Sequence, residues 1–179
     1  FEHTPNGRLL VYDPITQKTT TLLGGLYFAN GVALSSDESF VLVNETLMYR
    51  IQKYWLKGDK AGTSEIFIEN LPGFPDNVSS NEEGIFWVAL FNPRNNFVEM
   101  SSNKPFLRKI VFRLPELLQP QPINHSFVLG LNEDGKVVHN LQYQANEAYS
   151  PITSVKQYND TLYFGSLTHP GWGKIEVPK

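Results

Sequence analysis

Short runs of apolar and β-branched residues, each followed by turn-forming residues, recur along the whole chain. Gly, Pro, Asn, Asp and Ser gather between the runs. The runs, taken as predicted strands, are Arg8–Tyr12, Thr19–Leu23, Gly31–Leu34, Phe40–Val43, Arg50–Trp55, Glu65–Ile68, Ile85–Leu90, Phe127–Leu131, Val137–Leu141 and Thr161–Leu167. Short strands joined by tight turns indicate an all-β protein, either a sandwich, a barrel or a propeller.

An internal repeat distinguishes among these three architectures. Asn30–Val43 aligns with Asp76–Ala89, and in that alignment Phe40 meets Phe86. A third copy, Thr153–Ser166, follows the same pattern. Repeats of about 40–50 residues, with four strands in each, are typical of a β-propeller. The sequence therefore predicts a propeller.

One segment interrupts the repeat and the blade count is uneven. Phe91–Ser126 carries apolar residues at helical spacing, which predicts a helix over Asn103–Leu114 inserted within a blade. Two outer strands, two full blades and about three further strands are then expected in residues 1–27, 28–71, 72–144 and 145–179. A propeller must close on itself to protect its edges. We thus expect residues 1–179 to form one propeller domain without its N-terminal blades, which the rest of the chain or a partner would supply.

Composition narrows the classes of function. The chain has 179 residues and a formal net charge of −3, without a run of Lys or Arg, which argues against nucleic acid or an anionic membrane as partner. It has no Cys, so disulfides, thiolate zinc sites and cysteine nucleophiles are excluded. No apolar run approaches the roughly 18–20 residues of a membrane span. The sequence also has no phosphate-binding Gly-rich loop and no G-x-S-x-G elbow, which excludes nucleotide enzymes and serine hydrolases.

The repeat also predicts a site. Asn30, Asp76 and Thr153 occupy the same position in three copies, at the start of the innermost strand, and such positions surround the central channel of a propeller. Amide, carboxylate and hydroxyl oxygens that converge on one axis suit Ca²⁺, and Asn77 could add another oxygen. The alternative is that Asn30 and Asp76 only form Asx turns before their strands.

Three long strings resemble the strictosidine synthase-like family, which is related to the paraoxonases and to the gluconolactonase/regucalcin group. The strings are FANGVALSSDESFVLVNET, YRIQKYWLKGDKAGTSEIFIENLPGFPDNVS and ITSVKQYNDTLYFGSL. The resemblance extends over essentially the whole chain, including GRLLVYDP near its start. It implies a six-bladed propeller, of which this chain would cover about three and a half blades.

The resemblance also implies residue roles. In paraoxonases a catalytic Ca²⁺ lies in the channel, and the matching positions make Asn30, Asp76 and Asn77 its expected ligands here. Thr153 stands where strictosidine synthase carries its catalytic Glu, and a threonine takes no proton at neutral pH. His169 follows an inner strand and is a second catalytic candidate, although a loop histidine bonded to backbone is the favoured explanation.

Three functions follow from these expectations. The first is a Ca²⁺-dependent hydrolase of lactones or aryl esters, in which the metal acts as Lewis acid on a small-molecule substrate in the channel. The second is a condensing enzyme of the strictosidine synthase type, which joins an amine to an aldehyde and which Thr153 argues against. The third is a propeller that binds without catalysis.

Two further features have a structural explanation beside a functional one. Glu45 is either a buried partner or a channel residue, and we expect the former. Glycosylation sequons begin at Asn44, Asn77, Asn124 and Asn159. Asn77 cannot serve both as ligand and as glycan acceptor, so Asn124 and Asn159 are the expected acceptors in a secreted protein. The compartment stays open, with a secreted, periplasmic or luminal location favoured.

Overall fold

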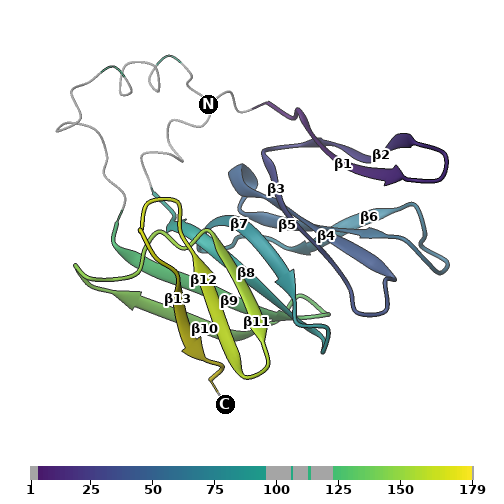
Figure 1. Ribbon diagram of the computed structural model, residues 1–179. Coiled ribbons are helices and arrows are strands. Elements are labelled where there is room, and N and C mark those ends of the chain that lie inside the picture. Colours follow the sequence, from purple (N-terminus) through teal and green to yellow (C-terminus); the bar gives the residue numbers. More distant parts are fainter. Residues whose placement is uncertain (1–3, 96–105, 107–112, 114–122, 179) are drawn as a thin grey trace.

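The structure is a computed structural model that describes residues 4–95, 106, 113 and 123–178. Its described strands form four antiparallel sheets, which we number as blades in chain order (Figure 1). Blade 1 contains β1 (Gly7–Asp13) and β2 (Lys18–Leu26). Blade 2 contains β3 (Ala29–Leu34), β4 (Phe40–Glu45), β5 (Arg50–Trp55) and β6 (Ser64–Ile68), with the short 3₁₀ helix η1 (Thr46–Met48) between β4 and β5.

The second half of the chain repeats this arrangement. Blade 3 contains β7 (Gly73–Ser80), β8 (Ile85–Pro93), β9 (His125–Asn132) and β10 (Val137–Gln144). Blade 4 contains β11 (Ser154–Tyr158), β12 (Thr161–Gly165) and β13 (Gly173–Glu176). Each sheet is a meander, because every strand pairs with its sequence neighbour. The predicted sequence of two outer strands, two full blades and three strands is confirmed.

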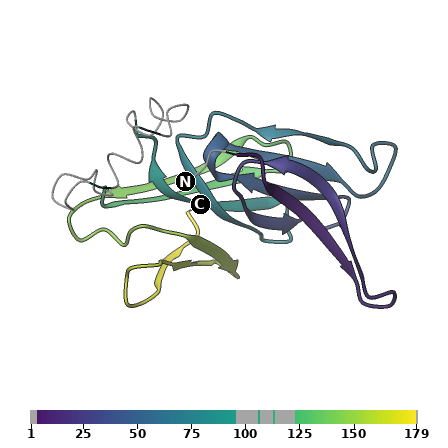
Figure 2. The same cartoon turned by 90° about the horizontal axis from the view of Figure 1, so that it is seen from above.

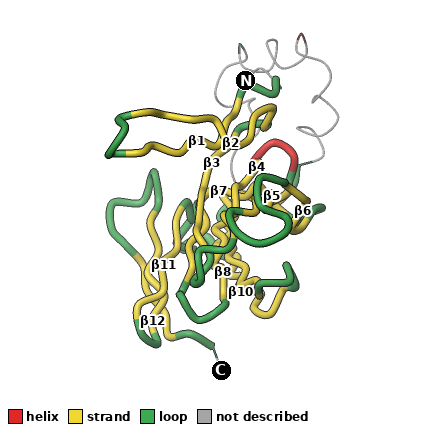
Figure 3. The backbone as a smooth tube through the Cα atoms, turned by 90° about the vertical axis from the view of Figure 1, so that its right-hand side faces the viewer, coloured by secondary structure: helices red, strands yellow, loops and turns green. Residues whose placement is uncertain are grey.

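The sheets fan out one after another, with blade 1 and blade 4 on opposite sides of the series (Figure 2). Their innermost strands β3, β7 and β11 lie side by side, and hydrogen bonds join β7 to blade 4. The backbone trace in Figure 3 shows strands joined by loops and turns, with the short helix η1 beside them. This is the arrangement of successive blades in a β-propeller.

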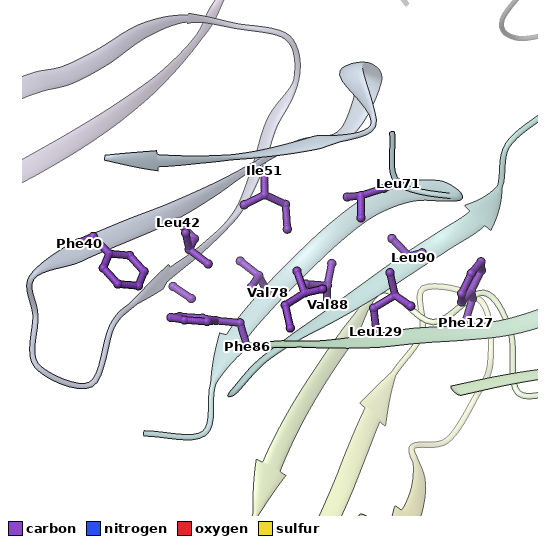
Figure 4. Close-up of a cluster of buried hydrophobic side chains, with 12 residues drawn as sticks. Phe40, Leu42, Ile51, Leu71, Val78, Phe86, Val88, Leu90, Phe127 and Leu129 are labelled. Carbon is purple, nitrogen blue, oxygen red and sulfur yellow. The ribbon is translucent and has the colours of Figure 1, made fainter. Parts of the chain in front are cut away.

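The apolar runs of β4 and β8 bury both of their faces, one against each neighbouring blade. On β4, Phe40 and Leu42 contribute to a cluster with blade 3, whereas Val41 and Val43 pack with blade 1. On β8, residues 86, 88 and 90 face blade 2 and residues 87 and 89 face blade 4. Figure 4 shows the cluster between blades 2 and 3. Two-sided burial explains why these strands are continuously apolar rather than alternating.

Strands β7, β11 and β13 do not appear among the predicted apolar runs. Strand β7 reads GFPDNVSS, with a proline and several polar residues, because it lies at the inner edge of its sheet and carries few core side chains. The predicted helix over Asn103–Leu114 lies outside the described residues, apart from Phe106 and Arg113. Among the described helices, none is long and apolar enough to cross a membrane.

Candidate functional site

Two irregular segments of the innermost strands β3 and β7 define the site. The pairing of β3 with β4 shifts register between Ala29 and Val32, and the pairing of β7 with β8 shifts between Pro75 and Val78. Asn30 lies inside the first irregularity, and Asp76 inside the second. Such irregularities redirect side chains and are frequent beside active sites. The repeat thus places two of the predicted ligands in equivalent distorted segments, which the apolar pattern could not indicate.

The two irregular segments also lie very close to each other. At Gly31, a Cβ atom would come within 2.6 Å of the Asp76 carbonyl oxygen and of the Val78 nitrogen. No side chain could be placed there without moving β7, so glycine is required at this crossing. Close approach of the backbones places the Asn30 side chain near enough to the Asp76 carboxyl to lower its pKa.

Asp76 carries a half-buried carboxylate. Burial raises the pKa of this carboxyl above its usual value, and the hydrogen bond from Asn30 offsets the shift only in part. The Asn77 side-chain amide donates to Asp76 Oδ1 at 3.2 Å. Within residues 4–95 and 123–178, the ion pairs involve Glu38, Glu45 and Glu65, and none includes Asp76. The Asp76 carboxylate therefore has amide neighbours but no cationic partner there.

Asn77 connects this corner to blade 4 through the backbone of Thr153. Its main-chain N–H and its side-chain amide both donate to the Thr153 carbonyl oxygen, at 3.2 and 2.8 Å. The Thr153 hydroxyl turns the other way and donates to the Gly165 carbonyl at 3.3 Å. Thr153 is buried and contributes its carbonyl to the site rather than its predicted hydroxyl. This role had no signal in the sequence, because any residue carries a carbonyl.

His169 lies on the exposed loop between β12 and β13. Its ring is 4.5 Å from the Tyr149 ring, and its Nδ1 accepts the Gly171 N–H at 3.4 Å. A neutral imidazole that accepts at Nδ1 carries its proton on Nε2. In this arrangement Nε2 is a donor, so a base role for His169 requires that the bond to Gly171 be given up.

The tripeptide Asn44–Glu45–Thr46 contacts the backbone of β7 at Asp76, and its three residues are 0%, 0% and 7% exposed. Asn44 Nδ2 donates to the Asp76 carbonyl at 2.8 Å, and the Thr46 hydroxyl donates to the Pro75 carbonyl at 2.6 Å. Glu45 is a buried partner, as expected. It accepts hydrogen bonds from the Tyr27 amide, Gln52 and Arg50.

The donor set at this corner fits a hard cation. Asp76 offers a carboxylate without a counter-charge, and the amide oxygens of Asn30 and Asn77 are ligands of the type that Ca²⁺ takes. No group of three or more His, Cys, Asp or Glu side chains is arranged for a metal in the described part of the chain. A site here would depend on amide oxygens around a single carboxylate, with further ligands from water or from other blades.

Comparison with known proteins gives the following matches. The family model for strictosidine synthase matches residues 1–59. Strictosidine synthase-like protein 10 from Arabidopsis thaliana is 41% identical, over 96% of this chain and 47% of the relative. Adipocyte plasma membrane-associated protein from Bos taurus is 36% identical, over 95% of this chain and 43% of the relative. The chain thus spans about half the length of the curated relatives it matches.

Solved structures share the fold at low sequence identity. The calcium-binding protein regucalcin from Agrobacterium tumefaciens superimposes with a TM-score of 0.56 at 15% identity, covering 94% of this chain and 47% of its own. A gluconolactonase from Xanthomonas campestris gives a TM-score of 0.56 at 14% identity, covering 88% and 40%. Likeness at this identity concerns the fold alone, and it confirms the predicted propeller.

Proposed function

The chain belongs to the strictosidine synthase-like family, and we propose that it forms part of a Ca²⁺-dependent hydrolase of lactones or aryl esters. The observation that carries this proposal is the half-buried Asp76 carboxylate, which has Asn30 and Asn77 as neighbours and no cationic partner among the described residues. Fold relatives described as a calcium-binding protein and a gluconolactonase support the same direction.

Each residue has a defined task in this proposal. Asp76 would supply the negative charge that holds the cation, and partial burial strengthens that attraction because the surroundings screen it less than water does. Asn30 and Asn77 would supply amide oxygens. Asn77 is already fixed by its two bonds to Thr153. When bound, Ca²⁺ polarises a carbonyl and stabilises the negative charge that develops on its oxygen.

Proton transfer is the open part of the mechanism. Thr153 and His169 are the catalytic candidates that the sequence provides. The Thr153 hydroxyl is engaged with Gly165, and the His169 ring with Gly171, so neither is poised as a base in this arrangement. We propose that water attacks a carbonyl of a small molecule in the central channel, with His169 as base only after its loop rearranges.

The test is hydrolysis of phenyl acetate and of a lactone by the full-length protein, with and without a chelator. We expect chelation or Asp76→Ala to lower the rate by at least about 100-fold, the scale on which loss of an electrostatic stabiliser acts. Asp160→Ala is the matched control, because Asp160 is an exposed aspartate at the β11–β12 turn. Turnover that survives both chelation and Asp76→Ala contradicts the proposal.

A second candidate is the condensation of an amine with an aldehyde, which the family-model match favours. It needs an acid/base carboxylate where this chain has Thr153, whose hydroxyl donates to a backbone carbonyl. Product formation from tryptamine and an aldehyde would support it. The third candidate, a binding propeller, predicts stabilisation by Ca²⁺ without turnover of any of these substrates.

A further inference from the structure

The tripeptide Asn44–Glu45–Thr46 reads as a glycosylation sequon, but its asparagine is fully buried. Its amide nitrogen is already committed to the Asp76 carbonyl. Attachment of a glycan at Asn44 would require this corner of the folded blade to open. The sequon thus has a different explanation, which is given by the contacts of its first and third residues.

The side chains of Asn44 and Thr46 donate hydrogen bonds to two consecutive carbonyl groups of the neighbouring blade. The Asn44 amide donates to Asp76, and the Thr46 hydroxyl donates to Pro75. Both acceptors adjoin the segment where β7 loses register with β8. Strand pairing alone leaves the backbone less constrained at such an irregularity. The two side chains of blade 2 supply the constraint that the ladder of blade 3 lacks there.

Thr46 also reaches the other predicted ligand. Its Oγ1 accepts the Asn30 side-chain amide at 3.3 Å while its hydroxyl proton goes to Pro75. The Thr46 hydroxyl therefore links the Asn30 side chain and the Pro75 carbonyl through two hydrogen bonds. These two hydrogen bonds fix β3 at Asn30 relative to β7 at Pro75.

Asn44 carries a cost in folding free energy. Its Oδ1 is the buried side-chain atom without a hydrogen-bond partner in the described residues, and an unpaired buried acceptor destabilises a protein. Reversing the amide would not help, because two oxygens would then face each other at Asp76. A leucine of similar shape would avoid this cost. An unpaired buried polar atom of this kind is expected at a functional site.

We propose that Asn44 and Thr46 are positioning residues, which hold Pro75 and Asp76 so that the Asp76 carboxylate and the side chains of Asn30 and Asn77 stay in place for a cation. This inference rests on the proposed calcium site. It assigns to blade 2 a supporting shell for ligands carried by blade 3. Loss of such supporting partners typically weakens metal binding by about 10- to 100-fold.

The test compares Asn44→Leu, Thr46→Val and Thr46→Ser in the full-length protein by calorimetric titration with Ca²⁺. We expect the first two to weaken binding at least about tenfold, and Thr46→Ser, which keeps the hydroxyl, to bind nearly as wild type. Ser79→Ala is the matched control, because Ser79 is also on β7 and donates to a carbonyl of the next blade, at Val155, away from the irregularity. It should bind Ca²⁺ as wild type does.

A second readout does not depend on metal. Amide hydrogen exchange at Asn77 reports whether its bond to Thr153 holds in Ca²⁺-free protein, and Asn44→Leu or Thr46→Val should accelerate it. Wild-type affinity together with unchanged exchange in both variants overturns the positioning role. If wild type binds no Ca²⁺, the proposed function fails, and exchange at Asn77 still decides the positioning role in either direction. Thr46→Val, which is isosteric, decides alone should Asn44→Leu fail to fold.

Discussion

A buried carboxylate, Glu45, and a half-buried carboxylate, Asp76, contrast with each other near the innermost strands. Glu45, at the end of β4, receives hydrogen bonds from the Tyr27 amide, from Gln52 and from Arg50. Burial raises the pKa of Glu45, but these bonds outweigh it and hold the pKa below its usual value. Asp76 has amide neighbours and, within residues 4–95 and 123–178, no ion pair, and its pKa is raised by burial.

The difference lies in what the adjoining hairpin provides. Glu45 pairs in register with Arg50, so the strand partner itself delivers the counter-charge. Asp76 lies where β7 and β8 are out of register, and no strand partner supplies a cation there. The charge of Glu45 is thus balanced by Arg50 within its own sheet, whereas the Asp76 carboxylate is available to a ligand. The predictions below test this contrast, beginning with the largest expected effect.

Glu45→Gln should lower the free energy of unfolding by about 3 kcal/mol, because removal of one partner leaves a partly buried Arg50 unpaired. Urea unfolding of the full-length protein measures the change. The control is Glu65→Gln, which breaks the exposed Lys60–Glu65 pair and should cost no more than about 0.5 kcal/mol. Equal losses in both variants would remove the basis of the contrast.

Saturating Ca²⁺ should raise stability by about 2.7 kcal/mol at roughly 100 times its Kd, a shift of several degrees in Tm. Thermal scans in EDTA and in Ca²⁺ measure this. Asp76→Ala should abolish the shift, whereas Glu45→Gln should keep it, although from a lower starting Tm. A shift that persists in Asp76→Ala would place the ion elsewhere in the molecule.

The smallest expected effect is a dependence of the Glu45 contribution on pH. The folded-state pKa of Glu45 is lowered from its usual 4.5, so its stabilisation is fully present above that value and is lost as pH falls through the folded-state pKa. The stability gap between wild type and Glu45→Gln should therefore narrow as the pH falls below the usual value of 4.5. A gap that stays constant over this range would mean that charge on Glu45 contributes nothing.

Most of the fold could be predicted from the sequence because the central apolar runs, in β4 and β8, bury two faces. The continuous run at Phe40–Val43 and its counterpart in β8 gave both strands and repeat period. The apolar pattern did not predict strand β7, although the repeat aligned Asp76 with Asn30. Asn30 lies near the start of β3, whereas Asp76 and Asn77 lie inside β7, and metal binding by these three residues stays a prediction.

The sequence by itself determined the all-β repeat, because local periodicity and turn chemistry record it directly. Alignment of the repeat gave the equivalence of Asn30, Asp76 and Thr153, and the resemblance of three long strings indicated the family. Only the tertiary structure decided which groups face one another. In the structure, the Thr153 hydroxyl donates to the Gly165 carbonyl, and Glu45 forms an ion pair with Arg50. Asp76 has no cationic partner among the described residues. These outcomes depend on strand register and on contacts between blades, which join residues far apart along the chain and leave no pattern within any one segment.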